Sequence, residues 1–207
     1  MPLDFRDRII QETAPIVPAP NFGELAALEH AGHRYIAARD RVLIEVRRPW
    51  LHLRWPITEQ DSLAAALPFG DVDSGITLAF GKVDRALLAR FLDAAEAAYP
   101  NEHAAWLVWD AREQRLKYRE LVILQASAGH VVVQRPALEE HESLAVDLHS
   151  HPKMDAFFSS QDDADDAGEV KISGVVGHLG TGAAPEWAFR LCALGVYLPL
   201  PGPRGLL

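Results

Sequence analysis

Cysteine is nearly absent from this 207-residue chain, because Cys192 is the only one. A single cysteine excludes an internal disulfide, and it excludes zinc sites that need two or more thiolates, including the His/Cys/Cys site of zinc deaminases. Basic residues are also scarce, with 20 Lys and Arg against 29 Asp and Glu, which gives a formal charge of −9. This balance argues against a surface whose main purpose is to hold nucleic-acid phosphates.

Long hydrophobic runs are missing as well. No run reaches the ~18 apolar residues of a membrane span, and residues 1–8 lack the apolar core of a signal peptide. We therefore expect a cytoplasmic protein with no membrane partner. What the chain does have is 49% hydrophobic and 24% charged residues, the composition of a globular protein that buries a core.

The residue pattern changes near residue 80, which predicts two parts and a short tail. Residues 1–80 are predicted to form an N-terminal β-rich extension. Residues 81–200 show clearer periodicity and are predicted to form the main domain. Residues 201–207 are left as a C-terminal tail.

Within the extension, residues 1–31 contain the closely spaced Pro15, Pro18 and Pro20 and little periodicity, so we expect an irregular lead-in. Arg34–Ala38 and Val42–Val46 lie on either side of a short polar turn and predict a hairpin. Leu51–Trp55 predicts a third strand.

The main domain begins with a pattern typical of an amphipathic helix over residues 83–99, because its apolar residues recur at three- and four-residue spacing. Further along, Ser159 and Ser160 predict the start of a short acidic helix that ends at about Gly168. The remaining apolar runs predict the strands Ala104–Trp109, Tyr118–Gln125, His130–Gln134, Leu144–His151, Val170–Val176 and Trp187–Tyr197.

The strand over Leu144–His151 carries alternating apolar and polar residues. Its apolar residues, predicted to face one way, are Leu144, Val146 and Leu148, and its polar residues, predicted to face the other way, are Asp147, His149 and His151. Two histidines at i and i+2 of a strand project from one face, so both imidazoles can reach a single metal ion.

A third ligand is available from the acidic helix that follows. Asp162, in its first turn, completes a set of two imidazoles and one carboxylate, and Asp166 is the next candidate one helical turn later. Such a set leaves zinc a fourth position for water, as in catalytic sites. Zinc lowers the pKa of that water from ~15.7 to about 7.

Hydrolysis also needs a group that moves a proton and a group that stabilises the oxyanion. Glu102, at the entrance to the strand over Ala104–Trp109, is the candidate general base. Ser159 is the candidate hydroxyl donor beside the metal.

These residues resemble the JAMM motif of the JAB/MPN/Mov34 metalloprotease family. In His149-Ser150-His151-Pro152, seven residues separate His151 from a following Ser-x-x-Asp, and Tyr99-Pro100-Asn101-Glu102 is similar to the family's Pro-x-Glu. The resemblance implies a mixed α+β fold of the MPN (cytidine-deaminase-like) type, with a central mixed β-sheet flanked by helices. It also implies that zinc is bound by His149, His151 and Asp162, that Glu102 activates water, and that Ser159 stabilises the oxyanion.

Within the family, the chain is similar to the PRTRC system protein A group, in Arg34–Asp40, Arg48–Leu51 and Arg190–Cys192. Members are encoded beside an E1/ThiF-like protein and a small ubiquitin-like protein. This resemblance implies a zinc-dependent peptidase or isopeptidase that cuts an amide bond at or near the C-terminus of a ubiquitin-like protein or its conjugate. The oligomeric state is not predicted.

Two other interpretations remain open. The first is a non-catalytic MPN scaffold in a mobile-element-encoded complex, although such scaffolds typically lack at least one ligand. The second is a cupin-type oxygenase that uses His149, His151 and Asp155, with His178 as the only histidine further along the chain. The strong helix predicted over residues 83–99 is out of place in a small β-barrel.

Two further features are expected to be structural. The segment Gly177–Gly182 superficially suggests a phosphate loop, but it lacks the Lys-Ser/Thr ending and is predicted to join two strands. Cys192, inside an apolar strand, is predicted to be buried.

Overall fold

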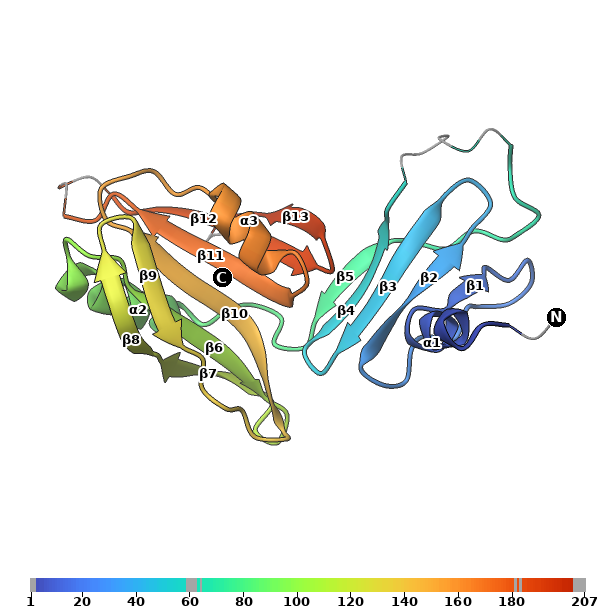
Figure 1. Ribbon diagram of the computed structural model, residues 1–207, viewed down its shortest axis with the longest axis horizontal. Helices are drawn as coiled ribbons and strands as arrows, with labels where there is room; N and C mark the ends of the chain where they lie inside the picture. Colours follow the sequence, from blue (N-terminus) through green and yellow to red (C-terminus); the bar gives the residue numbers. More distant parts are fainter. Residues whose placement is uncertain (1–2, 59–62, 64, 181, 183, 203–207) are drawn as a thin grey trace. The chain divides into compact units, whose positions relative to one another are not determined.

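The computed structural model describes residues 3–58, 63, 65–180, 182 and 184–202 (Figure 1). It divides into two compact units, Met1–Ala79 and Phe80–Leu207. Of the predicted tail, residues 203–207 lie outside the described residues. No helix in the described ranges has both the length and the apolar character that a membrane span requires.

The N-terminal unit is built on a five-stranded sheet in which β1 is parallel to β2 and the other pairs are antiparallel. Its strands are β1 (Ile16–Pro18), β2 (Gly32–Ala37), β3 (Val42–Arg48), β4 (Leu51–Pro56) and β5 (Gly75–Leu78). The predicted hairpin and third strand correspond to β2, β3 and β4.

The irregular lead-in expected over residues 1–31 is wrong at two places, because α1 (Phe5–Thr13) and β1 form there. The side chain of Asp4 accepts a hydrogen bond from the backbone N–H of Arg6 and so caps α1. None of the residues of α1 is buried, so packing against a core does not hold this helix in place.

The second unit contains a six-stranded mixed sheet and a separate two-stranded hairpin. The order in the large sheet is β13-β12-β11-β10-β6-β7, with β10 and β11 parallel and the other pairs antiparallel. These strands are β6 (Ala104–Asp110), β7 (Arg115–Glu120), β10 (Glu142–His151), β11 (Val170–Gly177), β12 (Glu186–Ala193) and β13 (Val196–Leu200). The hairpin consists of β8 (Val122–Ser127) and β9 (His130–Gln134).

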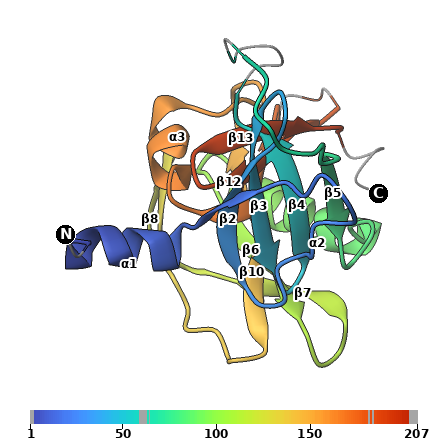
Figure 2. The same cartoon turned by 90° about the vertical axis from the view of Figure 1, so that its right-hand side faces the viewer.

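Two helices cover opposite faces of the large sheet (Figure 2). Helix α2 (Arg85–Ala98) is capped by Asp84, and its buried Phe91 ring lies 6.0 Å from the ring of Trp187 on β12. Helix α3 (Ser160–Asp166) and the β8–β9 hairpin lie on the other face. All seven residues of β6 are buried between these layers, which confirms the mixed α+β fold with a central sheet flanked by helices.

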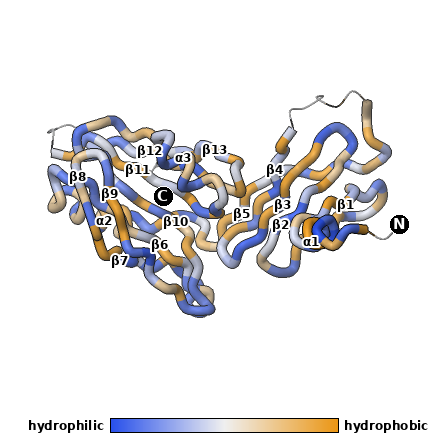
Figure 3. The backbone as a smooth tube through the Cα atoms, viewed as in Figure 1, coloured by the Kyte–Doolittle hydropathy of each residue, from blue (hydrophilic) through white to orange (hydrophobic). Residues whose placement is uncertain are grey.

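Hydrophobic residues run along the strands, and hydrophilic residues gather at turns such as the one between β6 and β7 (Figure 3).

Two predicted strands are in fact pairs of strands. Tyr118–Gln125 contains the end of β7 and the start of β8, and Trp187–Tyr197 contains the turn between β12 and β13. In that turn Leu194 and Gly195 have φ of 54° and 89°, the left-handed conformation of a tight hairpin turn. One glycine inside an apolar run is a weak signal for a turn.

The predicted alternation along β10 is wrong at Leu144. The register with β6 shifts between Leu144 and Val146, so one extra residue is inserted into β10. Leu144 consequently packs against the cluster that contains Trp106, on the same face as Asp147. A bulge cannot be read from alternation alone, because it depends on the partner strand.

Candidate metal centre

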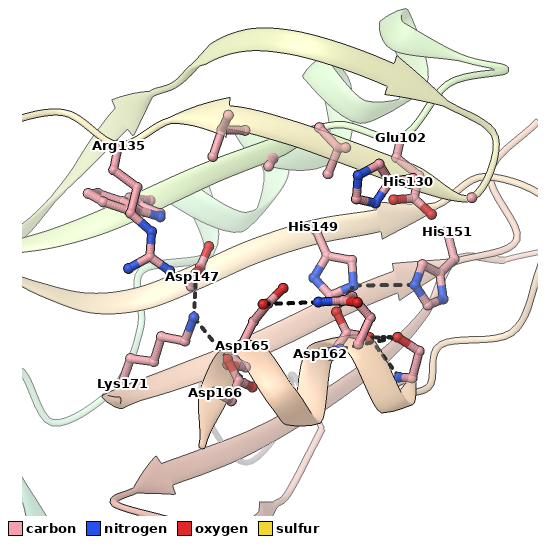
Figure 4. A pocket seen from close by; sticks show the side chains of 18 residues that line it. Glu102, His130, Arg135, Asp147, His149, His151, Asp162, Asp165, Asp166 and Lys171 are labelled. Carbon is pink, nitrogen blue, oxygen red and sulfur yellow. Dashed lines mark hydrogen bonds and ion pairs between the residues drawn. The ribbon is translucent and has the colours of Figure 1, made fainter. Parts of the chain in front are cut away.

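The Nε2 atoms of His149 and His151, both on β10, point into the same space (Figure 4). Nε2 of His149 lies 3.3 Å from Nε2 of His151, as expected for side chains two residues apart on one strand face. Asp162 enters from the first turn of α3, with Oδ1 3.5 Å from Nε2 of His149. The ligand atoms of all three residues lie within 4.8 Å of one another.

These distances can be compared with the geometry of a bound metal. In a tetrahedral zinc site with bonds of about 2.0–2.1 Å, neighbouring ligand atoms are about 3.3–3.4 Å apart. The His149–His151 distance of 3.3 Å matches that spacing, and the His149–Asp162 distance of 3.5 Å is close to it. The donor set of two imidazoles and one carboxylate therefore fits zinc in type, and two of its three ligand-atom distances match the spacing around a bound ion.

The protonation of His151 also suits a metal ligand. Its Nδ1 lies 3.2 Å from the backbone oxygen of Asp155, and because a carbonyl oxygen only accepts, Nδ1 must carry the hydrogen. In the neutral form of this ring the lone pair is then on Nε2, the atom that faces His149. The ring of Phe157 packs 4.8 Å from the His151 ring and limits its rotation.

His149 is held in its neutral form by its surroundings. Burial lowers the pKa of His149 below its usual value, whereas the Asp162 carboxylate acts in the opposite direction. A neutral imidazole keeps the lone pair that a metal needs.

Asp162 is oriented by a reciprocal cap at the start of α3. The hydroxyl and the backbone N–H of Ser159 both donate to Asp162 Oδ2, each at 2.6 Å. In return, the backbone N–H of Asp162 donates to Ser159 Oγ at 3.2 Å. Because Oδ2 is occupied in this way, Oδ1 is the oxygen directed at His149.

Glu102 lies in the pocket that these ligands line, although it comes from a distant part of the chain. It follows α2, and its backbone N–H donates to the oxygen of Ser127 at the end of β8 at 2.7 Å. Figure 4 shows its carboxylate directed toward the imidazoles of His149 and His151. Glu102 is only 5% exposed, and burial, with the negative charge of Asp162 as a smaller cause, raises its pKa to about 7.

Asp166, the alternative ligand, is committed elsewhere. Its carboxylate accepts hydrogen bonds from Ser173 at 2.8 Å and Arg190 at 2.7 Å, and it lies 2.9 Å from Nζ of Lys171. These hydrogen bonds and ion pairs of Asp166 hold the end of α3 against β11 and β12. Cys192, buried as predicted, directs Sγ at the same carboxylate at 3.3 Å.

Sequence reasoning missed the basic residues of this anchor. Lys171 and Arg190 lie on strands that otherwise read as apolar, and a charged residue at a buried strand position is the signal that could have revealed them. Arg135 and His130, which line the pocket beside the ligands, were also missed. His130 belongs to β9 and Arg135 follows it directly. The local sequence does not show that this segment lies close to β10.

The cupin-like set is not brought together. Asp155 directs Oδ1 at Nε2 of His178, 3.0 Å away, and the two side chains form a separate group with Glu186. The segment from Gly177 to Gly182 joins β11 to β12, which are antiparallel neighbours, so its predicted role as a connection between strands is confirmed.

Comparison with known proteins agrees with the motif. Residues 84–192 match the family described as prokaryotic homologs of the JAB domain, and this match spans more than half of the chain. The chain belongs to that prokaryotic JAB family. Residues 4–79 match a domain family of unknown function, DUF2016. The comparisons do not resolve the PRTRC group within the family, so that grouping stays a prediction.

Among solved structures, a JAB1/MPN domain protein from Archaeoglobus fulgidus is similar to this chain. It is 21% identical, with a TM-score of 0.37, and the match covers 57% of this chain and 94% of that one. No curated protein matches the chain significantly.

Proposed function

We propose that this prokaryotic JAB protein is a zinc-dependent metallopeptidase that hydrolyses an amide or isopeptide bond at or near the C-terminus of a ubiquitin-like protein. The observation that carries the proposal is the convergence of His149, His151 and Asp162 in a pocket that also holds a buried glutamate. The chemistry that zinc supplies at such a site is polarisation of a carbonyl oxygen and activation of water near neutral pH.

The protein's own part in the reaction centres on Glu102. Its carboxylate accepts a proton from the attacking water and returns it to the nitrogen of the leaving amine. A pKa of about 7 suits both steps, because the group can be ionised before the attack and protonated after it. The buried position of Glu102 also keeps bulk water from competing for that proton.

Ser159 was predicted to stabilise the oxyanion, but its hydrogen is directed at Asp162 Oδ2. A hydroxyl has a single hydrogen to donate, so an oxyanion and Asp162 would compete for it. We therefore infer that Ser159 acts first as the residue that orients the carboxylate of Asp162.

An extended chain terminus suits this pocket as a substrate. In the part of the chain that the structure describes, β9 is paired only with β8, and Val131 and Val133 of β9 line the pocket. An extended peptide can add to such a free strand edge through backbone hydrogen bonds. The choice of a ubiquitin-like tail, and of an E1/ThiF-like protein as a further partner, rests on the resemblance to the PRTRC group.

The decisive experiment is to incubate the zinc-loaded protein with a ubiquitin-like protein of the kind encoded beside PRTRC group members, fused to a reporter. Intact mass spectrometry locates any cleavage. We expect cleavage by the wild-type protein and none by Glu102→Gln, which keeps the side-chain shape but cannot accept the proton. Glu140→Gln is the matched control, because Glu140 is exposed and lies outside the pocket.

Stable binding of the fusion protein without cleavage would instead support the non-catalytic scaffold. The zinc content of Glu102→Gln distinguishes the causes of inactivity, since this variant should retain the metal of the wild-type protein. Cleavage at the wild-type rate by Glu102→Gln would refute the assigned role of the glutamate.

A further inference from the structure

A second group of potential metal ligands lies where the loop that connects β10 to α3 meets the end of β11 and the start of β12. Asp155 belongs to this loop, His178 follows β11, and Glu186 begins β12. Nε2 of His178 lies 3.0 Å from Oδ1 of Asp155 and 3.6 Å from Oε2 of Glu186. The ligand atoms of the three residues lie within 4.8 Å of one another, the same limit that the three ligands of the first centre meet.

The backbone builds this group from three segments that are tied together. The N–H of His178 donates to the oxygen of Met154 at 3.0 Å, and the N–H of Ala156 donates to Oε2 of Glu186 at 3.2 Å. The close approach depends on Gly177, because a Cβ there would lie 2.5 Å from the oxygen of Met154. The three side chains are therefore brought together by main-chain geometry and not only by flexible surface charges.

Both carboxylates of this group face the same nitrogen of the His178 ring. Two carboxylates approach one ring nitrogen, and a neutral imidazole offers at most one hydrogen there, so it can satisfy only one carboxylate oxygen at a time. A divalent ion bound between the three atoms would interact favourably with all of them. One imidazole and two carboxylates form a ligand set that zinc and similar transition ions accept, whereas magnesium prefers oxygen ligands alone.

We propose that Asp155, His178 and Glu186 form a second divalent transition-metal site, which fastens the loop over residues 152–158 to the ends of β11 and β12. This loop joins the strand that carries His149 and His151 to the helix that carries Asp162. The site is directly linked to the first centre, because the backbone oxygen of Asp155 accepts the hydrogen bond from Nδ1 of His151.

The exposure of the group sets the expected strength of binding. The side chain of Asp155 is 78% exposed, that of Glu186 is 53% exposed and that of His178 is 34% exposed. Such ligands remain hydrated and mobile, so the ion should bind more weakly than at the first centre and exchange with solvent. The second ion is thus a reversible clamp on the loop, and the proposal does not depend on the hydrolase activity.

The test counts zinc ions per chain by equilibrium dialysis and elemental analysis, with the full-length protein and excess magnesium present. The wild-type protein should bind two ions. His178→Asn, Asp155→Asn and Glu186→Gln should each lose the weaker ion and keep the tighter one. Asparagine is chosen at position 178 because it tolerates the left-handed backbone, φ 63°, found there.

The first centre is removed separately to keep the two sites distinct. His149→Ala should lose the tighter ion and retain the weaker one, and adding His178→Asn should abolish binding. The controls are His30→Gln and Asp93→Asn, which remove an exposed histidine and an exposed carboxylate outside both groups and should leave both ions bound. A wild-type protein that binds only one ion at saturation, or a His178→Asn variant that still binds two, would overturn the second site.

The clamp itself has a readout that does not involve activity. In the His149→Ala variant, zinc should slow backbone hydrogen exchange in residues 153–158, where the N–H of Ala156 is bonded to Glu186. Zinc should have no such effect in the His149→Ala/His178→Asn variant. Equal exchange with and without zinc in the first variant would contradict the clamp even if an ion is bound.

Discussion

Ser159 donates its hydroxyl hydrogen to Oδ2 of Asp162 at 2.6 Å, while the other carboxylate oxygen of Asp162 is directed at His149. The same serine is the N-cap of α3, and its backbone N–H donates to the same Oδ2. Helix capping and ligand orientation are therefore performed by one set of hydrogen bonds. A change at Ser159 should alter both the stability of the helix start and the affinity for metal.

The first prediction concerns Ser159→Ala. Losing the hydroxyl removes a cap worth about 1 kcal/mol and frees the Asp162 carboxylate to rotate, which should weaken zinc binding by about 10–100-fold. Chelator competition measures the affinity, and urea unfolding measures the stability. Ser159→Thr keeps the hydroxyl and should behave like the wild-type protein. Unchanged zinc affinity together with a large loss of kcat would instead favour the oxyanion role predicted from the motif.

The second prediction concerns the pH dependence of metal-free protein. Burial raises the pKa of Glu102 from 4.5 to about 7, so between these values the folded protein binds a proton that the unfolded chain has released. Stability from this group is thus fully present below pH 4.5 and is lost as the pH rises through 7. Metal-free Glu102→Gln should match the wild-type protein near pH 4.5 and exceed its stability by about 2–3 kcal/mol at pH 8.

Urea unfolding at several pH values, with chelator present, checks this difference. Comparing the two proteins cancels the titration of the histidines, which both share. Glu140→Gln is the control and should show no pH-dependent difference from the wild-type protein. A stability difference between Glu102→Gln and wild type that stays constant with pH would contradict the raised pKa.

The third prediction concerns the anchor of α3. The ammonium of Lys171 lies 2.7 Å from Asp147 and 2.9 Å from Asp166, and its side chain is only 4% exposed. Lys171→Met should lower the free energy of unfolding by about 3–5 kcal/mol, because it leaves a buried carboxylate without this partner. Arg115→Met removes an exposed pairing with Glu113 and should cost less than about 1 kcal/mol. Urea unfolding measures both losses. Equal losses of unfolding free energy in the two variants would show that the buried ion pairs of Lys171 stabilise the fold no more than an exposed pair does.

The fourth prediction concerns Gly177→Ala. The added Cβ would lie 2.5 Å from the oxygen of Met154 and 2.6 Å from the nitrogen of Ala156, both backbone atoms that cannot rotate away. The loop over residues 152–158 should shift, which moves Asp155 and disturbs its hydrogen bond to His151. We expect a loss of about 1–3 kcal/mol in stability and weaker zinc binding at the first centre.

Gly168→Ala is the matched control, because a Cβ at Gly168 meets no atom within 4 Å. Its zinc affinity, measured by chelator competition, should equal that of the wild-type protein. An unaltered affinity in Gly177→Ala would mean that the loop position does not influence the first centre.

Much of the JAB unit could be predicted because its signals are local. The periodicity of α2, the continuous apolar run of β6 and the cap at Ser159 each act over a few residues, and each predicted element forms. The predictions fail where the structure depends on a distant partner strand or on a weak turn signal. The bulge at Leu144 depends on the pairing of β10 with β6, and Gly195 interrupts an apolar run that reads as one strand.

The sequence by itself determined the kinds of ligand and their local spacing, because a strand places His149 and His151 on one face and a capped helix start follows at a set distance along the chain. Only the tertiary structure decided which oxygen of Asp162 faces the imidazoles, that Asp166 is committed to Lys171 and Arg190, and that Glu102 lies buried beside the site. The physical reason is that local periodicity acts through neighbours in the chain, whereas desolvation and ion pairing arise between segments that meet only when the sheet assembles.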